Sequence, residues 1–264
     1  MLTRIGKRFP SLLLVTGLLV ILFVAVKHYQ ALKNRSTAKK DMRQDLVSVS
    51  VPRGQQKKLD LPDGSTVWLN AASFLTYPGN MNRDGRTVEL NGEGFFVVKN
   101  EPEHPFRVRA RDMMVEVLGT QFNIRDYPEE TIVQTVLKEG AVKVTHADEQ
   151  VVLHPGESVE LESSRLRGPT LTVHSGVDAG AVMEWTKGYL KFTGVNLTTL
   201  LHELSRAYDI DIRLEGDMPG VNFYGSFSRE LPVEEVLKLL NGHDHVVEIT
   251  WASQRSLTVR VLSL

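Results

Sequence analysis

The sequence contains no cysteine among its 264 residues. A chain without cysteine cannot form disulfides, a thiolate nucleophile, or Cys-ligated zinc and iron–sulfur sites. It also lacks an excess of charge of either sign, because 31 basic and 32 acidic residues give a formal net charge of -1. Proteins that bind nucleic acid usually present a strongly basic surface, so the composition indicates no nucleic-acid partner.

Familiar catalytic motifs are absent as well. The sequence has no Walker loop, no G-x-S-x-G and no H-E-x-x-H. Gly92-Glu93-Gly94 lacks the third glycine of a dinucleotide-binding loop, and residues 95–98 continue as a strand where that loop would open a helix. We expect these glycines to belong to the scaffold.

Two further groups of polar residues are candidates for chemistry. His243-Asp244-His245 could ligate a metal, but neighbouring loop residues rarely converge on one ion. Glu101, Glu103 and His104 could form an acid–base set, yet they stand beside two prolines, as residues of a polar loop do. The sequence therefore predicts no catalytic, cofactor-binding or metal site, and a protein that is not an enzyme.

A single long apolar run, without any charge, lies at residues 12–26. Together with the preceding residues it predicts a transmembrane helix at 10–26, after a short leader at 1–9. A cleaved signal peptide is the alternative, because Arg4, Lys7 and Arg8 form a basic start. The run is long for a signal peptide, however, and Ala25-Val26-Lys27 is a poor cleavage site.

The charges around this helix barely decide its orientation, because basic residues also follow it. Short basic leaders normally stay in the cytoplasm while a large domain is translocated, so we expect the N-terminus inside. Residues 27–50 are rich in Lys, Arg, Gln, Ser and Asp, which predicts a juxtamembrane linker.

From residue 51 to 175 the sequence predicts an all-β domain. Short alternating runs separated by turn residues indicate about ten strands and no helix, which is typical of a sandwich or a solenoid-like domain. The runs lie at 66–69, 87–90, 95–98, 106–108, 115–118, 122–124, 133–137, 142–144, 150–153 and 158–161. Pro62-Asp63-Gly64, Lys138-Glu139-Gly140 and His154-Pro155-Gly156 have the residue types that tight turns need.

After a linker at 176–184, residues 185–264 predict a small α+β domain of βαβ-βαββ type. Predicted strands lie at 189–192, 210–214, 221–227, 246–251 and 257–261. Asn196 can cap the first helix, and Pro232 suits the first turn of the second. The apolar faces of these helices are formed by Leu197, Leu200, Leu201, Leu204 and Tyr208, and by Val233, Val236, Leu237 and Leu240.

Several ordered motifs resemble the FecR family. These motifs are Leu61-Pro62-Asp63-Gly64-Ser65-Thr66-Val67-Trp68-Leu69-Asn70, Leu75-Thr76-Tyr77-Pro78, Glu89-Leu90-Asn91-Gly92-Glu93-Gly94-Phe95-Phe96, Pro105-Phe106-Arg107-Val108, Val117-Leu118-Gly119-Thr120-Gln121-Phe122-Asn123-Ile124, Leu137-Lys138-Glu139-Gly140-Ala141-Val142-Lys143-Val144 and Leu153-His154-Pro155-Gly156-Glu157. The segment from Trp185 onward is similar to the C-terminal domain of Bacteroidetes members, which looks like the short N-terminal signalling domain of secretins and TonB-dependent receptors.

The resemblance implies an anti-sigma factor or sigma regulator of the inner membrane, with most of the chain in the periplasm and no cofactor. Its partners would be a TonB-dependent outer-membrane transducer, typically for iron or glycan uptake, and an extracytoplasmic-function sigma factor. Family members carry a helical cytoplasmic segment of several tens of residues that binds the sigma factor. Residues 1–9 are too short for such a segment, so we expect sigma contact to need residues or a polypeptide beyond this sequence.

We expect the transducer's signalling domain to dock on the C-terminal domain by adding strands edge to edge, at 189–192 or 221–227. A membrane-anchored glycan-binding module or enzyme is the rival hypothesis, with Trp68, Tyr77, Trp185 and Trp251 as a stacking platform. Clustered, exposed aromatic rings would favour it. A truncated signal receiver without sigma contact is the third.

Overall fold

The structure, a computed structural model, describes Lys27, Gln30 and residues 46–81, 85–162, 168–216, 220–241 and 247–262. The predicted leader 1–9 and membrane helix 10–26 lie outside the described residues. No helix that the described residues form is both long and apolar enough to cross a bilayer. The chain divides into two compact units, residues 1–46 and 47–264, and the domains below belong to the second unit.

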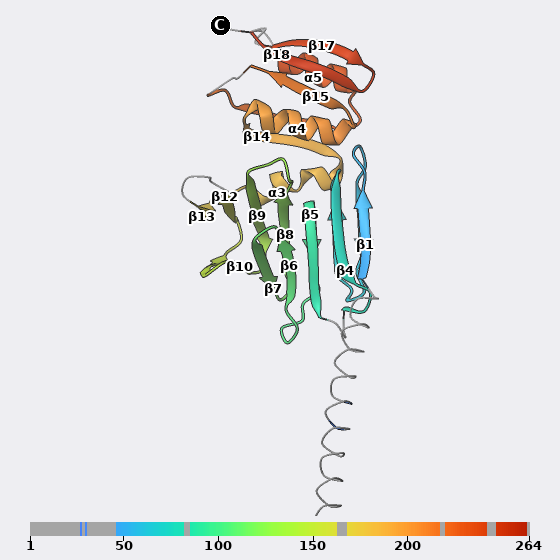
Figure 1. The fold of residues 1–264 in the computed structure, drawn as a ribbon. Coiled ribbons are helices and arrows are strands. Elements are labelled where there is room, and N and C mark those ends of the chain that lie inside the picture. The colour runs from blue at the N-terminus through green and yellow to red at the C-terminus, as the bar shows by residue number, and fades with distance from the viewer. Residues whose placement is uncertain are drawn as a thin grey trace, which may run out of the picture. The chain divides into compact units, whose positions relative to one another are not determined.

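Thirteen strands make up the first domain (Figure 1). They are β1 (Leu46–Val51), β2 (Lys57–Asp60), β3 (Thr66–Leu69), β4 (Ser73–Pro78), β5 (Arg86–Val97), β6 (Phe106–Ala110), β7 (Met113–Val117), β8 (Gln121–Asp126), β9 (Ile132–Glu139), β10 (Val142–His146), β11 (Glu149–Leu153), β12 (Glu157–Glu162) and β13 (Thr170–Ser175). The prediction of a domain rich in strands is confirmed.

The central strand, β5, takes part in two sheets. Its first half pairs with β4 and, in parallel, with β6, whereas its second half pairs with β3 and β8. The prediction of two separate strands, at 87–90 and 95–98, was wrong because the chain bends at Gly92 without leaving the sheet. Gly92 has φ +101°, and a Cβ atom there would lie 2.4 Å from the hydroxyl oxygen of Ser73. Only glycine fits this bend.

The two sheets share one core. They run in the order β11-β10-β7-β6-β5-β4-β1 and β2-β3-β5-β8-β9-β12-β13. Phe96 of β5 stacks on Phe122 of β8 with ring centroids 5.1 Å apart, and its ring lies 6.2 Å from that of Phe106 of β6. All three side chains are fully buried. Because inward side chains of both sheets meet in this way, the domain is a sandwich and not a solenoid.

The C-terminal domain has the predicted order of strands and helices. After α3 (Ala179–Val182) and the short 3-10 helix η1 (Glu184–Lys187) come β14 (Tyr189–Val195), α4 (Leu197–Tyr208), β15 (Asp211–Glu215), β16 (Phe223–Ser228), α5 (Val233–Asn241), β17 (Val247–Ser253) and β18 (Ser256–Val261). β14 pairs with β16, and β18 lies between β15 and β17.

The two longer helices bury the faces that the sequence indicated. The side chain of Asn196 accepts a hydrogen bond from the backbone N–H of Thr199, as an N-cap does. Four leucines of the α4 stripe are buried, and so are Val233, Val236 and Leu237 of α5. Together they form the core of this domain. Tyr208 is half-buried and donates from its hydroxyl to the carbonyl oxygen of Leu231.

Two segments predicted as linkers contain regular structure. Residues 46–50, placed at the end of the juxtamembrane linker, belong to β1, which pairs with β4. Residues 176–184 include α3. The side chain of Asp178 caps the N-terminus of this helix by accepting a hydrogen bond from the Ala181 N–H. Residues 47–51 alternate valine and serine with the period of a strand, a signal that the linker assignment overlooked. α3 is only one turn long, so tertiary contacts decide its structure.

Candidate functional site

The groups weighed for chemistry do not assemble into a reactive centre among the residues described. Gly92-Glu93-Gly94 lies within β5 and not at a strand-to-helix turn. Glu101 is a loop residue whose hydrogen bond from Lys99 lowers its pKa, and the carbonyl oxygen of His104 accepts from Arg86. His243-Asp244-His245 lies outside the described residues. In the part of the chain that the structure describes, no group of His, Asp and Glu is arranged to hold a metal ion.

The four aromatic residues considered as a stacking platform do not form an exposed groove. Trp185 is buried in a small cluster with Phe95 and Met183, and half-buried Trp68 packs against it. Tyr77 packs against the sandwich core, and Trp251 lies on β17 in the other domain. This arrangement removes the observation that would have favoured glycan binding.

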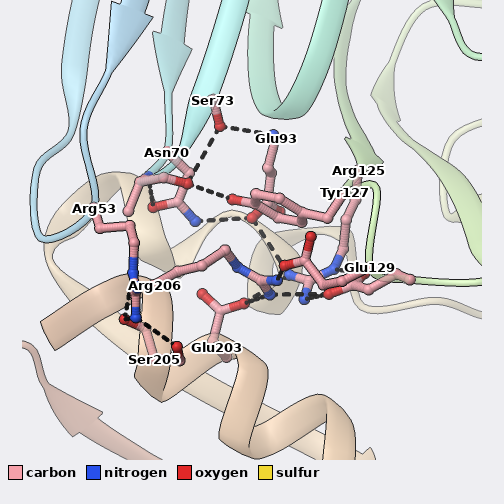
Figure 2. A network of polar contacts seen from close by, with 12 residues as sticks. Arg53, Asn70, Ser73, Glu93, Arg125, Tyr127, Glu129, Glu203, Ser205 and Arg206 are labelled. Carbon is pink, nitrogen blue, oxygen red and sulfur yellow. Dashed lines mark hydrogen bonds and ion pairs between the residues drawn. The ribbon is translucent and has the colours of Figure 1, made fainter. Parts of the chain in front are cut away.

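What the structure does contain is a buried polar network between the two domains (Figure 2). Its centre is Glu93, the charged residue between the two glycines of β5, which is 3% exposed. One carboxylate oxygen accepts a hydrogen bond of 2.8 Å from the Asn70 amide, and the other accepts one of 2.9 Å from the Asn123 amide. The side-chain amide oxygen of Asn123 in turn accepts a 3.3 Å hydrogen bond from the indole N–H of Trp185. Glu93 therefore fixes two asparagines of the sandwich, and Asn123 passes the contact on to Trp185.

Arginines of the two domains share carboxylates in the same network. Arg125 of β8 lies 2.8 Å from a carboxylate oxygen of Glu203 on α4 and 2.6 Å from one of Glu130. Arg206, one turn further along α4, lies 2.9 Å from both Glu203 and Glu130 and also pairs with Glu129. Each domain thus supplies charges of both signs, and Arg125–Glu203 and Arg206–Glu130 cross the boundary.

Burial and charge shift the pKa values of the two central carboxyls in opposite directions. Burial alone would favour neutral Glu203, but Arg125 and Arg206 outweigh it and lower the pKa of Glu203 from 4.5 to about 2. At Glu93 burial prevails over the attraction of Arg125, and Glu203 adds repulsion, so the pKa of Glu93 is raised. The ionised form of Glu203 therefore stabilises the junction.

Tyr127 of the sandwich supports the arginines from one side. Its ring lies 3.7 Å from the guanidinium carbon of Arg206 and 5.1 Å from that of Arg125, both within the range of cation–π attraction. Its hydroxyl donates to the carbonyl oxygen of Ala71. Burial raises the pKa of the Tyr127 hydroxyl well above its usual value, so it stays a neutral donor.

A second set of contacts reaches α4 from the loop after β1. The guanidinium of Arg53 donates to the carbonyl oxygen of Ser205 at 2.9 Å and to that of Ile210. The Gly54 N–H donates to the carbonyl oxygen of Arg206 at 2.7 Å. The carbonyls of Ser205 and Arg206 belong to the last turn of α4, whereas Ile210 stands between α4 and β15. Hydrogen-bond donors are favourable at this end of a helix, where the carbonyl oxygens point. The sandwich therefore holds both the middle and the end of this helix.

A groove of about 610 Å³ opens beside the network. It is lined by β14 along its length, by His202 and neighbouring residues of α4, and by Gln134 and Glu160 of the sandwich. Tyr189 on β14 is 45% exposed, whereas Leu190 and Phe192 of the same strand are core residues. The strand at 189–192, considered for partner contact, thus alternates between core and surface.

The network was missed when only the sequence was considered, although one signal pointed to it. Glu93 stands between two glycines beside Phe95 and Phe96, in the half of β5 that is otherwise apolar, where a charge is costly unless it is paired. Glu203 and Arg206 are spaced as an ordinary i, i+3 surface pair on a helix, which hides their burial. Which residues pair across domains depends on how the domains pack, and that is not visible in local patterns.

These observations define a class of protein: a β sandwich joined through buried charges to a small α+β domain. Comparison with protein families agrees with this description. The FecR protein model matches residues 47–143, and the model of the FecR C-terminal domain matches residues 189–249. The chain belongs to the FecR family.

Two solved structures are similar to most of the chain. Both are crystal structures of a candidate anti-sigma factor from Parabacteroides distasonis ATCC 8503, at 2.50 and 1.65 Å resolution. Each is 28% identical in sequence, and the TM-scores are 0.74 and 0.73. The alignments cover 83% and 82% of this chain and 100% of each solved chain. Comparison with curated proteins finds no match.

Proposed function

We propose that this protein is a sigma-factor regulator of the anti-sigma type and not an enzyme. The observation that carries the proposal is the presence of both FecR domains in order, together with similarity to candidate anti-sigma factors over the whole length of their solved chains. The buried network agrees with this role, because its carboxylates are engaged by arginine and amide donors and join two domains.

Deletion of the gene in the native organism tests the regulator role. Transcription from the promoter of the neighbouring extracytoplasmic-function sigma factor would be measured with and without the inducing nutrient. We expect transcription to lose its dependence on the inducer. Unchanged induction in the deletion strain would refute the proposal. Co-purification of the sigma factor with the full-length chain separates direct contact from action through another polypeptide.

The proposal includes an inner-membrane location, with the helix at 10–26 as anchor and both domains in the periplasm. It is supported by the uncharged apolar run at 12–26 and the basic residues before it. Alkaline phosphatase fused after residue 264 should be active, because that enzyme folds only outside the cytoplasm. Green fluorescent protein at the same place should be dark after export by the general secretory route. The reverse pattern would place the domains in the cytoplasm.

The proposed input is the signalling domain of a TonB-dependent transducer, docking on the two-stranded sheet of β14 and β16. Each of these strands pairs with the other on one side only, as far as the described residues show. Tyr189 and Tyr224 are exposed on them, at 45% and 75%. A free strand edge with exposed aromatic residues suits recognition by strand addition.

Photocrosslinking tests this docking site. A benzophenone amino acid in place of Tyr189 should crosslink to the transducer in the envelope of inducer-treated cells. The same probe at Leu118, which is 44% exposed on the sandwich, is the control and should not crosslink. Equal crosslinking at the two positions, or none at Tyr189, would contradict docking on this sheet.

A further inference from the structure

The end of β1 is held by the C-terminal domain. Among the strands that the structure describes, β1 is the last of its sheet and pairs with β4 alone. Its exposure changes along its length: Leu46 is 56% exposed and Val47 is 39% exposed, whereas Val51 is 3% exposed. The strand is therefore weakly anchored where it follows residues 27–45 and firmly anchored at its far end.

The far end leads directly into the residues that grip α4. Besides the carbonyl oxygens of Ser205 and Ile210, the Arg53 guanidinium lies 2.7 Å from the Ser205 hydroxyl and 2.7 Å from a carboxylate oxygen of Asp211. A cation is favoured at the C-terminus of a helix, where the carbonyl dipoles converge. Arg53 and the Gly54 N–H together form what we name the α4 clamp.

The same helix is also fixed to the sandwich through Glu203 and Arg206, which lie within one helical turn of Ser205 (Figure 2). The Arg206 side chain enters the buried network while its carbonyl oxygen accepts from Gly54. A displacement of α4 that breaks the network must therefore also disturb the clamp. Ser205 strengthens this link, because its hydroxyl donates to the Ile210 carbonyl oxygen that Arg53 also contacts.

We propose that α4 and the α4 clamp form a conformational coupling device that controls whether β1 stays in its sheet. While α4 rests on the sandwich, the clamp holds β1 at its only well-buried end. When α4 moves, the clamp opens and β1 detaches from β4 starting at its exposed end. Only the direction of the coupling, from the C-terminal domain toward the segment before residue 46, rests on the proposed function.

Hydrogen exchange of the full-length protein in lipid nanodiscs tests the device without any partner. Arg53→Ala removes the side-chain part of the α4 clamp, and we expect amide exchange of residues 46–51 to rise at least about tenfold, as loss of charge-assisted hydrogen bonds gives. Exchange of β6 and β7 should stay unchanged. Arg260→Ala is the control, because Arg260 pairs with Glu215 and Glu248, which both lie on strands of the C-terminal domain and not on α4.

Glu203→Gln tests transmission from the other side of α4. It should raise exchange in residues 46–51 more than in β6 and β7. Unchanged exchange of β1 in Arg53→Ala, or an equal rise in all strands, would overturn the clamp. A response to Arg53→Ala but none to Glu203→Gln would overturn the coupling through α4. Because no sigma factor is needed, a failed transcription assay with intact coupling would count against the proposed function alone.

Discussion

Glu203→Gln is the substitution that most directly probes the junction between the two domains. Glutamine keeps the size of the side chain but removes the charge that Arg125 and Arg206 share. The variant leaves Arg125 and Arg206 without the one buried carboxylate that both contact on α4, and removing one partner of a buried ion pair is costly. We expect a folded but less stable protein.

The magnitude follows from the shift of the pKa of Glu203 from 4.5 to about 2. Such a shift corresponds to roughly 3 kcal/mol of preference for the ionised acid in the folded state. Part of this loss is offset, because removing the Glu203 charge also removes its repulsion on buried Glu93. The free energy of unfolding at pH 7 should therefore fall by roughly 2 to 3 kcal/mol.

The pH dependence gives the sharper test. A folded pKa below the unfolded value stabilises the protein above pH 4.5, and the effect is lost as the pH falls through about 2. The difference between wild type and variant should thus shrink to about half by pH 3. Urea unfolding of residues 47–264, followed by tryptophan fluorescence, measures it.

Glu235→Gln serves as the control for the charge change itself. Glu235 pairs with Lys238 on the exposed face of α5, so its replacement should leave the urea midpoint unchanged. Equal midpoints for Glu203→Gln and wild type at pH 7 would refute the argument. So would a difference that does not depend on pH, because it would arise from packing and not from the ion pairs.

Two other substitutions test the sandwich. Gly92→Ala should prevent folding or lower the free energy of unfolding by roughly several kcal/mol. Gly85 also has a positive φ (+87°) but lies in open space, so Gly85→Ala should lower it by only about 1 to 2 kcal/mol in a urea titration. Similar losses would show that the close contact at Gly92 is unimportant. Asp63→Asn should cost about 3 to 5 kcal/mol, because Arg86 lies 2.8 Å from Asp63 and both are buried. Glu89→Gln, which affects an exposed pair, should have no measurable effect on the midpoint, and a comparable loss there would contradict the role of burial.

Most of the fold was predictable because its signals are local. Alternating apolar residues indicated the strands of the sandwich, and the 3.6-residue period of leucines indicated α4. The break at Gly92-Glu93-Gly94 misled the prediction, because glycine marks both turns and bends within a strand. β1 was also assigned to a linker, because it follows a polar and charged stretch, although its valines and serines alternate as in a strand.

The junction between the domains could not be predicted, and the reason is physical. Each arginine there is paired with carboxylates that are distant in sequence: Arg125 with Glu203, and Arg206 with Glu129 and Glu130. On its own domain each of these residues is an ordinary surface charge. Only when both domains are folded does packing remove water and make the pairs specific, because an unpaired partner would then be left buried. The same condition makes partial separation of the two domains costly, because it would leave a buried charge without its partner.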